Sequence, residues 1–562
     1  MNKNLVSSDY LVFILYFIIV AGYGYSVYRK RKSREHDSKA FFLAEGSLTW
    51  WAIGASMIAS NISAEQFVGM SGDGFFLGMG VAAYEWIAAV ALIIVAVWFI
   101  PVYLKNHIYT MPQFLKTRYN ETVALIMAVF WLFLYIFVNL TSILYLGAVA
   151  IDGLVGGNHL HEIMIGLAIF ALIITLGGMK VIGYTDVIQV SVLIIGGLAT
   201  TYLALTIVGE RFGVGSNPFS GFKALMDHAP DHFHMIIPKP TSESPQLAIN
   251  KYLILPGVAT YFAGQWIVNL NYWGCNQYIT QRALGADLQT ARTGILFAGF
   301  LKLLMPVIVM LPGIAAFVLY QNGELPQLVG GNKDKAYSAI LGFLPSGLKG
   351  LSIAALTAAI VSSLAGKVNS ISTIFTLDIY KKYFNREADE RKLVITGRVT
   401  VFVAMIIALI FTWKDILGIG GAGGFTFIQK YTGFISPGVF AMFILGMFWK
   451  RTTGLAAIVG VITGFVLSVF FNEFAPAVLG HENFLYTSYP NGKGEYEIPF
   501  LICMGWAFFF TMVVMIAISL AGPRVNEKAF DLDRSMFKLK PSTIVLITLT
   551  LVILMAIYAK FW

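Results

Sequence analysis

The sequence contains few charged residues and very little cysteine. Asp, Glu, Lys and Arg make up only 12% of its 562 residues, about half the share found in soluble globular proteins. The chain lacks polar linkers, low-complexity tracts and the Walker A, GxSxG and HExxH motifs, so ATP hydrolysis and the common hydrolase chemistries have no support. The two cysteines, Cys275 and Cys503, lie in apolar stretches and are interpreted as small apolar residues, not as a disulfide framework.

Apolar residues dominate instead. They make up 57% of the chain, and runs of about 20 apolar residues, the length that crosses a bilayer, follow one another with little pause. We therefore expect an all-α integral membrane protein, with a single polytopic domain over residues 1–562 and about fourteen transmembrane helices. The predicted spans cover residues 10–28, 48–77, 78–104, 122–151, 162–178, 184–209, 252–276, 293–320, 348–379, 393–413, 424–448, 453–472, 499–522 and 542–561.

Positive charge is unevenly distributed among the predicted connections. When these alternate between the two sides, 24 of the 39 Lys and Arg fall on the side of the connector RKRKSREHDSK, Arg282 and Arg292 among them, and 11 fall on the other. Because cytoplasmic loops carry the excess of Lys and Arg, we expect a multi-pass protein of the inner cell membrane with both termini outside. The net charge of +9 then reflects topology, with the lipid bilayer as a partner and no nucleic acid.

The second predicted span is unusually polar at its centre. Residues Ser60 to Gln66 read SNISAEQ, and short polar side chains compete with the helix for backbone hydrogen bonds. We expect the helix to be interrupted here. Interrupted helices at membrane depth line cavities, and in transporters they free carbonyl oxygens to bind a cation. The alternative is a kink stabilised by neighbouring helices.

Two further strings, WIVNLNYWGCNQYITQR and AALTAAIVSSLAGKVNSISTIFTLDIY, carry polar groups inside predicted spans. Amide side chains in the first would suit a neutral, hydroxyl-rich ligand, and Tyr272 and Trp273 offer flat faces for a pyranose; hydrogen bonding between helices is the alternative. In the second, the adjacent hydroxyls of Ser362 and Ser363 suit Na⁺, with close helix packing as the alternative. The amides are Asn269, Asn271, Asn276 and Gln277. The histidines His228, His232 and His234 fit no standard zinc spacing and are interpreted as part of a solvated loop.

The strings NISAEQFVGMSG, YEW, YTDVIQV, NYWGCNQYITQR, SSLAGKVNSISTIFTLDIY and FIQKYTGFISPG resemble the sodium/solute symporter family, in particular its sodium/glucose and sodium/galactose cotransporters. The resemblance covers nearly the whole chain. It implies a core of five plus five helices related as an inverted repeat, with the first repeat at about 48–209 and the second at about 252–448. The peripheral helices would then be 10–28, 453–472, 499–522 and 542–561.

The resemblance also implies the site residues. A sugar would be bound by Gln66, Glu85, Asn269, Lys302 and Gln429, with Asn61 and Glu65 nearby. Met70, Tyr84 and Phe425 match the family's outer gate, and Tyr272 matches its inner gate. One Na⁺ would be bound by the carbonyls of Ala59, Ile62 and Ala359 with the hydroxyls of Ser362 and Ser363, and Asp186 matches an acid on the ion path toward the cytoplasm.

Four positions depart from the family pattern. Ala88 stands where the galactose transporters have a serine, which leaves the identity of the sugar open. Ala365 and Gly366 replace the serines of a second sodium site found in some relatives, so we expect one site. Lys367 lies four residues after Ser363 on the same helical face, and three hypotheses follow for it: an ion pair with Asp186 that tunes sodium release, replacement of Na⁺ by the ammonium, or extension toward the cytoplasmic interface.

The function that these residues imply is secondary active transport and not enzymatic catalysis. We expect Na⁺-coupled symport of a neutral sugar, a hexose such as galactose or glucose, by alternating access, in a monomer or loose homo-oligomer. The alternatives are symport of another solute, such as a polyol or a sialic-acid-like anion, and cation-independent or proton-linked sugar transport that uses Lys367. A sugar sensor and a channel are alternatives from other classes.

Overall fold

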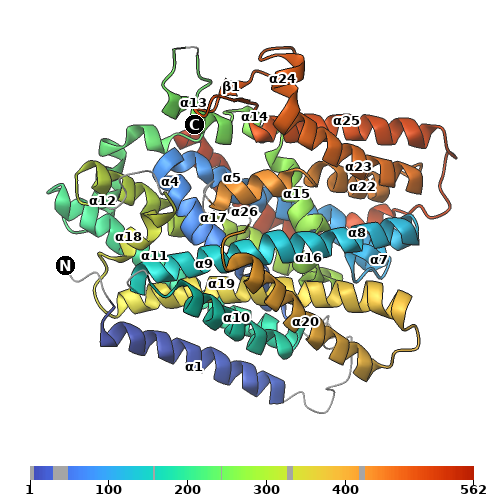
Figure 1. Cartoon of the computed structure of the whole chain (residues 1–562), viewed down its shortest axis with the longest axis horizontal. Helices are drawn as coiled ribbons and strands as arrows, with labels where there is room; N and C mark the ends of the chain where they lie inside the picture. The colour runs from blue at the N-terminus through green and yellow to red at the C-terminus, as the bar shows by residue number, and fades with distance from the viewer. Residues whose placement is uncertain (1–4, 30–47, 156–157, 242, 326–332, 417–423) are drawn as a thin grey trace. The chain divides into compact units, whose positions relative to one another are not determined.

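In the computed structural model the chain is helical over most of its length (Figure 1). The structure describes residues 5–29, 48–155, 158–241, 243–325, 333–416 and 424–562. Within them, every predicted span overlaps a helix, which confirms the all-α prediction. Among the described residues, ten helices are long and apolar enough to cross a membrane, or eleven if the bent pair Gln246–Phe262 and Gln265–Cys275 forms one span. The basic connector at 30–39 lies outside the described residues.

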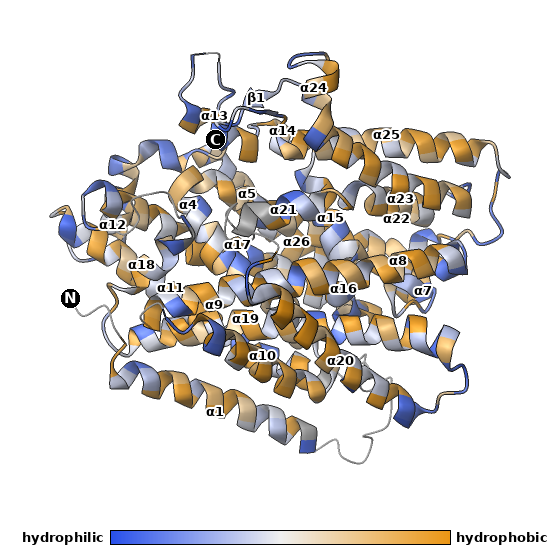
Figure 2. Cartoon of the chain, in the orientation of Figure 1, coloured by the Kyte–Doolittle hydropathy of each residue, from blue (hydrophilic) through white to orange (hydrophobic). Residues whose placement is uncertain are grey.

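The described helices expose apolar side chains as lipid-facing helices do. Hydropathy colouring shows apolar residues along the length of α23 (Gly454–Val469) and α25 (Phe500–Leu520), with hydrophilic residues gathered in the connections (Figure 2). In α1 (Ser7–Arg29), Leu11, Ile14 and Ile18 are more than half exposed. Such a surface is stable in hydrocarbon and costly in water.

The chain divides into two compact units. The first comprises Met1–Val81, Ala128–Phe233 and Gln281–Phe427. Besides α1, its helices are α3 (Trp50–Asn61), η3 (Glu65–Met70), α4 (Ser71–Leu77), η6 (Leu134–Leu140), α9 (Thr141–Val155), α10 (Leu160–Leu176), α11 (Met179–Arg211), α12 (Pro218–His228), η7 (Pro230–Phe233), α17 (Leu288–Gln321), η9 (Lys333–Lys335), α18 (Ala336–Leu341), α19 (Leu348–Thr373), η10 (Ile374–Phe384) and α20 (Glu390–Thr412).

Four helices form the centre of the first unit. Here α11 packs against α17 and against α19, and α3 packs against all three. Glycine permits a close approach of α4 to this centre, since at Gly313 on α17 a β-carbon would lie 1.9 Å from the carbonyl oxygen of Ser71. α19 is buried almost throughout, so its polar residues must find partners inside the protein. This centre carries the predicted sodium ligands other than Ile62, together with Asn61, Asp186, Lys302 and Lys367.

The second unit comprises Ala82–Met127, His234–Thr280 and Ile428–Trp562. Besides α23 and α25, it contains α5 (Ala83–Ile94), η5 (Val95–Phe99), α6 (Ile100–Lys105), α7 (Met111–Arg118), α13 (Gln246–Ile254), α14 (Ala259–Phe262), α15 (Gln265–Cys275), α22 (Ser436–Phe448), η12 (Phe470–Phe474), α24 (Ala475–Leu479), η13 (Arg534–Phe537) and α26 (Pro541–Phe561). The boundary between the units crosses η4 (Gly78–Ala82), α8 (Glu121–Phe133), α16 (Gln277–Leu284) and α21 (Gly424–Gly433).

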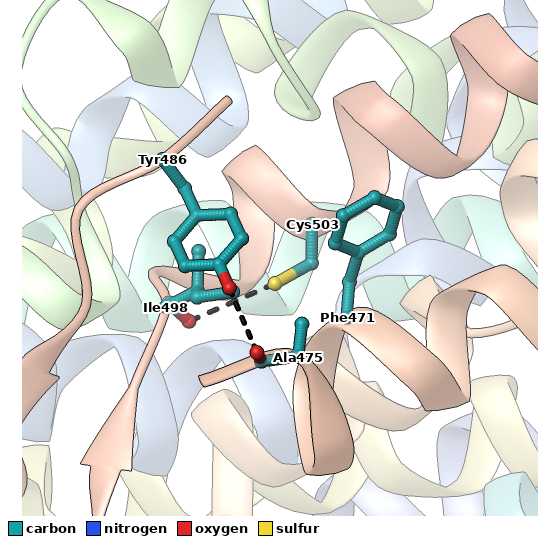
Figure 3. Close-up of a cluster of buried hydrophobic side chains, with 5 residues drawn as sticks. All are labelled: Phe471, Ala475, Tyr486, Ile498 and Cys503. Carbon is teal, nitrogen blue, oxygen red and sulfur yellow. Dashed lines mark hydrogen bonds between the residues drawn. The ribbon is translucent and has the colours of Figure 1, made fainter. Parts of the chain in front are cut away.

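Side chains of the second unit fix the connection before α25 to the helices. Figure 3 shows Tyr486 and Cys503 packed with Phe471, Ala475 and Ile498. The Tyr486 hydroxyl donates to the carbonyl of Ala475 at 2.8 Å, and the Cys503 thiol lies 3.8 Å from the carbonyl of Ile498. Both cysteines are free and buried, as the apolar interpretation predicts. The same connection contains the hairpin of β1 (Tyr489–Pro490) and β2 (Tyr496–Glu497), paired antiparallel.

Candidate functional site

The second predicted span is interrupted where its polar string lies. α3 ends at Asn61, and Ile62 is extended, with φ −79° and ψ 117°. The helix resumes at Glu65 as η3, a π-helix. The prediction of a break is therefore confirmed, and the break lies inside the first unit with every residue from 59 to 66 buried.

A capping box starts the helix again after the break. The backbone N–H of Ser63 donates to Oε1 of Gln66 at 3.0 Å, and the backbone N–H of Glu65 donates to Oγ of Ser63 at 3.1 Å. This reciprocal pattern of Ser and Gln three residues apart satisfies N–H groups that a helix start leaves without partners. The fold thus uses the amide oxygen of Gln66 as an acceptor for the backbone N–H and the hydroxyl of Ser63.

One hydroxyl of the adjacent pair on α19, that of Ser363, faces this break. Oγ of Ser363 donates to the carbonyl oxygen of Ser60 at 2.7 Å and lies 3.3 Å from that of Ile62. Ser362 instead donates to Oδ1 of Asp186 on α11. Of the predicted sodium ligands, the structure thus brings Ser363 and Ile62 together, while Ala59 and Ala359 are buried in the same two helices. Hydroxyl and carbonyl oxygens are the ligands that hard cations prefer.

Asp186 is the centre of a buried polar network. Its Oδ2 accepts from Oγ of Ser56 and lies 3.9 Å from a terminal nitrogen of Arg282. Arg282 in turn donates through Nε to Ser56 at 2.8 Å and through Nη2 to Ser60. The side chains of Arg282 and Asp186 have no exposed surface, so each charge depends on the other and on these hydroxyls.

Two buried lysines contact the residues of the break. Lys302, on α17, donates to Oδ1 of Asn61; both are predicted sugar residues, and both are buried. Nζ of Lys367, on α19, lies 3.8 Å from Oε1 of Glu65. The hypothesis that Lys367 pairs with Asp186 was therefore wrong: the acid partner of Lys367 is Glu65, and the basic partner of Asp186 is Arg282.

The second unit contains the remaining predicted sugar residues. Glu85 lies in the first turn of α5 and is buried, and α5 packs against α15, which carries Asn269. The side-chain amide of Asn269 donates to the carbonyl of Gln265 at 2.9 Å. Gln429 is half-buried on α21. Glu85 and Asn269 are thus buried side chains of the same unit.

The predicted gate residues also belong to different units. Met70, at the end of η3, is buried in the first unit. In the second unit Tyr84 is buried, and the hydroxyl of Tyr272 accepts from that of Tyr278. Phe425 lies in α21, and its side chain is outside the described part of the chain.

Two amide side chains of the string NYWGCNQYITQR form hydrogen bonds within the protein. The amide of Asn271 donates to Oγ of Ser436 at 3.1 Å, and Oε1 of Gln277 accepts from the backbone N–H of Met111 at 2.7 Å. For these two residues, the structure shows the alternative of hydrogen bonding between helices. His232 stacks on Phe317, and no group of three His, Cys, Asp or Glu within the described ranges could hold a metal ion.

The second unit contains a broken helix as well. α13 and α14 precede α15 with a bend of 73°. The break comes at Ala263 and Gly264, where a β-carbon on Gly264 would lie 2.6 Å from the carbonyl oxygen of Leu501. Each predicted repeat thus begins with an interrupted helix.

Comparison with known proteins identifies the family. The model of the sodium:solute symporter family matches residues 41–464. The chain belongs to the sodium:solute symporter family. The symporter is 42% identical over 569 residues to a sodium/glucose cotransporter of Vibrio parahaemolyticus, an alignment that covers 99% of this chain and 98% of the relative.

More distant relatives place the symporter in the same family. It is 34% identical to sodium/myo-inositol cotransporter 2 of Sus scrofa, over 83% of this chain and 70% of the relative. A solved Na⁺-coupled sialic acid symporter superposes with a TM-score of 0.75 at 20% identity, covering 93% of this chain and 99% of that one. At that identity the likeness shows the fold of the symporter.

Sequence reasoning missed one residue of the symporter's buried network. It assigned Arg282 to a cytoplasmic connection, but the structure buries Arg282 against Ser56, Ser60 and Asp186. A signal was present, because Arg282 ends the polar string NYWGCNQYITQR. A long charged side chain next to a polar membrane segment can extend inward as well as outward.

Proposed function

We propose that the protein is a secondary active transporter that couples the entry of Na⁺ to the accumulation of a neutral hexose. The observation that carries the proposal is the hydroxyl of Ser363 set against the carbonyl oxygens of Ser60 and Ile62 at the break. Freed carbonyls at an unwound helix beside hydroxyls of a facing helix suit a sodium ion. The family membership and the likeness to sodium/glucose cotransporters support the same function.

A single sodium site fits the surroundings of the hydroxyl pair. At Gly366 a β-carbon would lie 2.6 Å from a terminal nitrogen of Arg282 and 3.0 Å from Oγ of Ser60. No side chain could stand there without displacing Arg282, whose positive charge also disfavours a second cation. We therefore propose one ion per cycle, bound by Ala59, Ile62, Ala359, Ser362 and Ser363.

The proposed sugar residues provide both donors and acceptors. Lys302 and the NH₂ of Gln66 donate, Glu85 accepts, and the amides of Asn61, Asn269 and Gln429 can do either. Sugar hydroxyls need this mixture, and the acid Glu85 disfavours an anionic solute. Glu65 completes the proposed set. Met70, Tyr84 and Phe425 would close over the sugar on the outer side and Tyr272 on the inner side.

The proposed architecture is the inverted repeat of five plus five helices within fourteen spans. Interrupted helices at the start of both predicted repeats, at residues 62–64 and 263–264, support it. We further propose an inner-membrane location with both termini outside, since the uneven distribution of Lys and Arg supports that orientation. A monomer or loose homo-oligomer is proposed as the working form.

Sodium and solute transport are coupled if the protein with both ligands bound converts between its outward-open and inward-open states more readily than the protein with one ligand bound. Sodium bound at the break would hold the outward-open state, and the sugar would then engage residues 61, 65 and 66 of the same segment. Only the doubly loaded protein would close and reopen inward. The membrane potential contributes about 2.3 kcal/mol per charge per 100 mV, so one sodium can drive substantial accumulation.

A cyclic polyol is the second candidate solute. The likeness to sodium/myo-inositol cotransporters at 34% identity supports it. Both solutes present a ring of hydroxyls to the same donors and acceptors. Competition of galactose, glucose and myo-inositol for uptake of one labelled solute distinguishes them.

The direct test is uptake by purified protein in proteoliposomes. We expect labelled hexose to accumulate above the outside concentration when an inward Na⁺ gradient is imposed, and to equilibrate without it. Counterflow with a panel of sugars identifies the solute. Equal uptake with and without the gradient would refute sodium coupling.

Variants of Gln66 test the solute site without disturbing the break. Q66E keeps an oxygen that can accept from the N–H of Ser63 but removes the NH₂ donor, whereas Q66A removes both. We expect Q66E to fold normally and to raise KM for the solute at saturating Na⁺. Wild-type KM in Q66E would contradict the assignment, and the thermal stability of Q66A reports the capping role separately.

A further inference from the structure

The ion pair between Lys367 and Glu65 is buried and imperfectly matched. The two residues are 4% and 7% exposed, and Nζ lies 3.8 Å from Oε1. This distance exceeds a hydrogen bond, and Oε1 of Glu65 accepts none. A buried carboxylate oxygen in this state retains a strong tendency to bind another donor or a cation.

The pair lies one helical turn from the proposed ion ligands. Lys367 follows Ser363 by four residues on α19, and side chains of a helix lean toward its N-terminus, which here means toward Ser363. Glu65 follows Ile62 by three residues, and the carbonyl of Ile62 lies 3.3 Å from the Ser363 hydroxyl. Lys367 and Glu65 thus join the same two elements as the ion site does, α19 and the break.

Buried charges lie close to the break on several elements of the first unit. Arg282 is next to Asp186, Lys302 is next to Asn61, and Lys367 is next to Glu65. Each of these fixed cations weakens the binding of a sodium ion at the break.

We propose that Lys367 is a built-in competitor of the coupling ion, and that Glu65 is the acid that Lys367 and Na⁺ share. In the empty protein Lys367 holds the carboxylate. When Na⁺ binds at the break, the carboxylate gains a second cation, its attraction to Lys367 is partly replaced, and Oε1 is presented to a solute hydroxyl. Lys367 thus lowers sodium affinity, favours release of the ion into the cell, and links ion binding to the solute residue Glu65. This inference rests on the proposed sodium-coupled function.

The experiment measures the Na⁺ concentration that gives half-maximal solute uptake, in proteoliposomes at low solute concentration. Variants are K367M, which removes the charge at similar length, K367R, which keeps it, E65Q, and the double variant K367M/E65Q. We expect K367M to lower the half-saturating Na⁺ on the order of three- to tenfold, and E65Q to raise it. The half-saturating Na⁺ of the double variant should lie between those of K367M and E65Q. K367R should shift the half-saturating Na⁺ far less than K367M does.

A matched control lies further along the same helical run. Lys382 pairs with Asp378 at 2.7 Å on η10, about four turns beyond Lys367, and K382M should leave the sodium dependence at the wild-type value. Thermal stability of each purified variant verifies folding. Where K367M is not recovered folded, K367Q carries the same prediction.

Opposite shifts in K367M and E65Q support the proposal, because loss of packing alone would not change sodium affinity in opposite directions. An unchanged or raised half-saturating Na⁺ in K367M, with the wild type sodium-dependent, overturns this inference and leaves the proposed function standing. Sodium-independent accumulation by the wild type overturns both.

Discussion

The hydroxyl of Ser363 is the group whose removal tests the ion site most directly. It is fully buried, donates to the carbonyl of Ser60 at 2.7 Å and lies 3.3 Å from that of Ile62. S363A removes one oxygen and keeps the helix, because alanine has the highest helix propensity. We expect the variant to fold and to bind sodium weakly.

The size of the effect follows from the charge of the ligand. A hydrogen-bonding group that interacts with a charged partner contributes about 1.5–3 kcal/mol, and each 1.4 kcal/mol is a factor of ten in affinity. Loss of the Ser363 hydroxyl should therefore raise the half-saturating Na⁺ roughly tenfold to hundredfold. The loss of its hydrogen bond to Ser60 should cost about 1 kcal/mol of stability. The solute KM at saturating Na⁺ should change little.

The assay is solute uptake by proteoliposomes over a series of Na⁺ concentrations. Ser370 provides a matched control, since it is also fully buried on α19 but donates to the carbonyl of Gly366 in its own helix at 3.0 Å. S370A should keep the wild-type sodium dependence. A wild-type dependence in S363A as well would refute the reasoning that this hydroxyl is a sodium ligand.

Two predictions concern stability. R282M leaves the carboxylate of Asp186 buried without its cation, which should cost about 3–5 kcal/mol of stability and lower the melting temperature in detergent. The double variant D186N/R282M should recover most of this loss. An equal loss of stability in R282M and in the double variant would contradict the pairing of Arg282 with Asp186. Asp287 caps α17 through the N–H groups of Gln289 and Thr290, so D287A should cost about 1 kcal/mol. Hydrogen bonds from Thr290 lower the pKa of Asp287. The stabilisation by Asp287 is therefore complete at pH values above the ordinary carboxyl pKa and is lost as pH falls through the lowered pKa. The melting temperatures of the wild type and D287A should therefore converge in acid, and a difference that stays constant with pH would refute this prediction.

The break and its hydroxyl partners could be predicted because the relevant signals are local. Seven residues with five polar side chains, Ser60 to Gln66, cannot remain an uninterrupted lipid-facing helix. Adjacent hydroxyls at Ser362 and Ser363 in a stretch of small residues also identify a helix that packs closely. These properties follow from each segment alone.

The partners of the buried charges could not be predicted, because they depend on how the chain continues after an irregular residue. The four-residue spacing predicts that Lys367 and Ser363 share one face of α19. It does not predict which neighbouring element that face contacts. The extended conformation of Ile62 changes the direction of the helix that carries Glu65, and the acid then lies near Lys367. In the same way, α16 begins after the extended Asn276, and Arg282 at its end points into the core. A regular helix through either position would have given different pairs.

The arrangement of the break explains how one segment can serve two ligands. Backbone carbonyls of Ser60 and Ile62 face the hydroxyl of Ser363, whereas the side chains of Asn61 and Glu65 contact lysines on α17 and α19. In the proposed function, the main chain of these few residues would form part of the ion site, and their side chains would form part of the solute site. An ion that fixes the carbonyls also fixes the φ and ψ angles that aim Asn61 and Glu65. Departure of the ion would release those angles and weaken solute binding, so coupling requires no signal to travel beyond this segment.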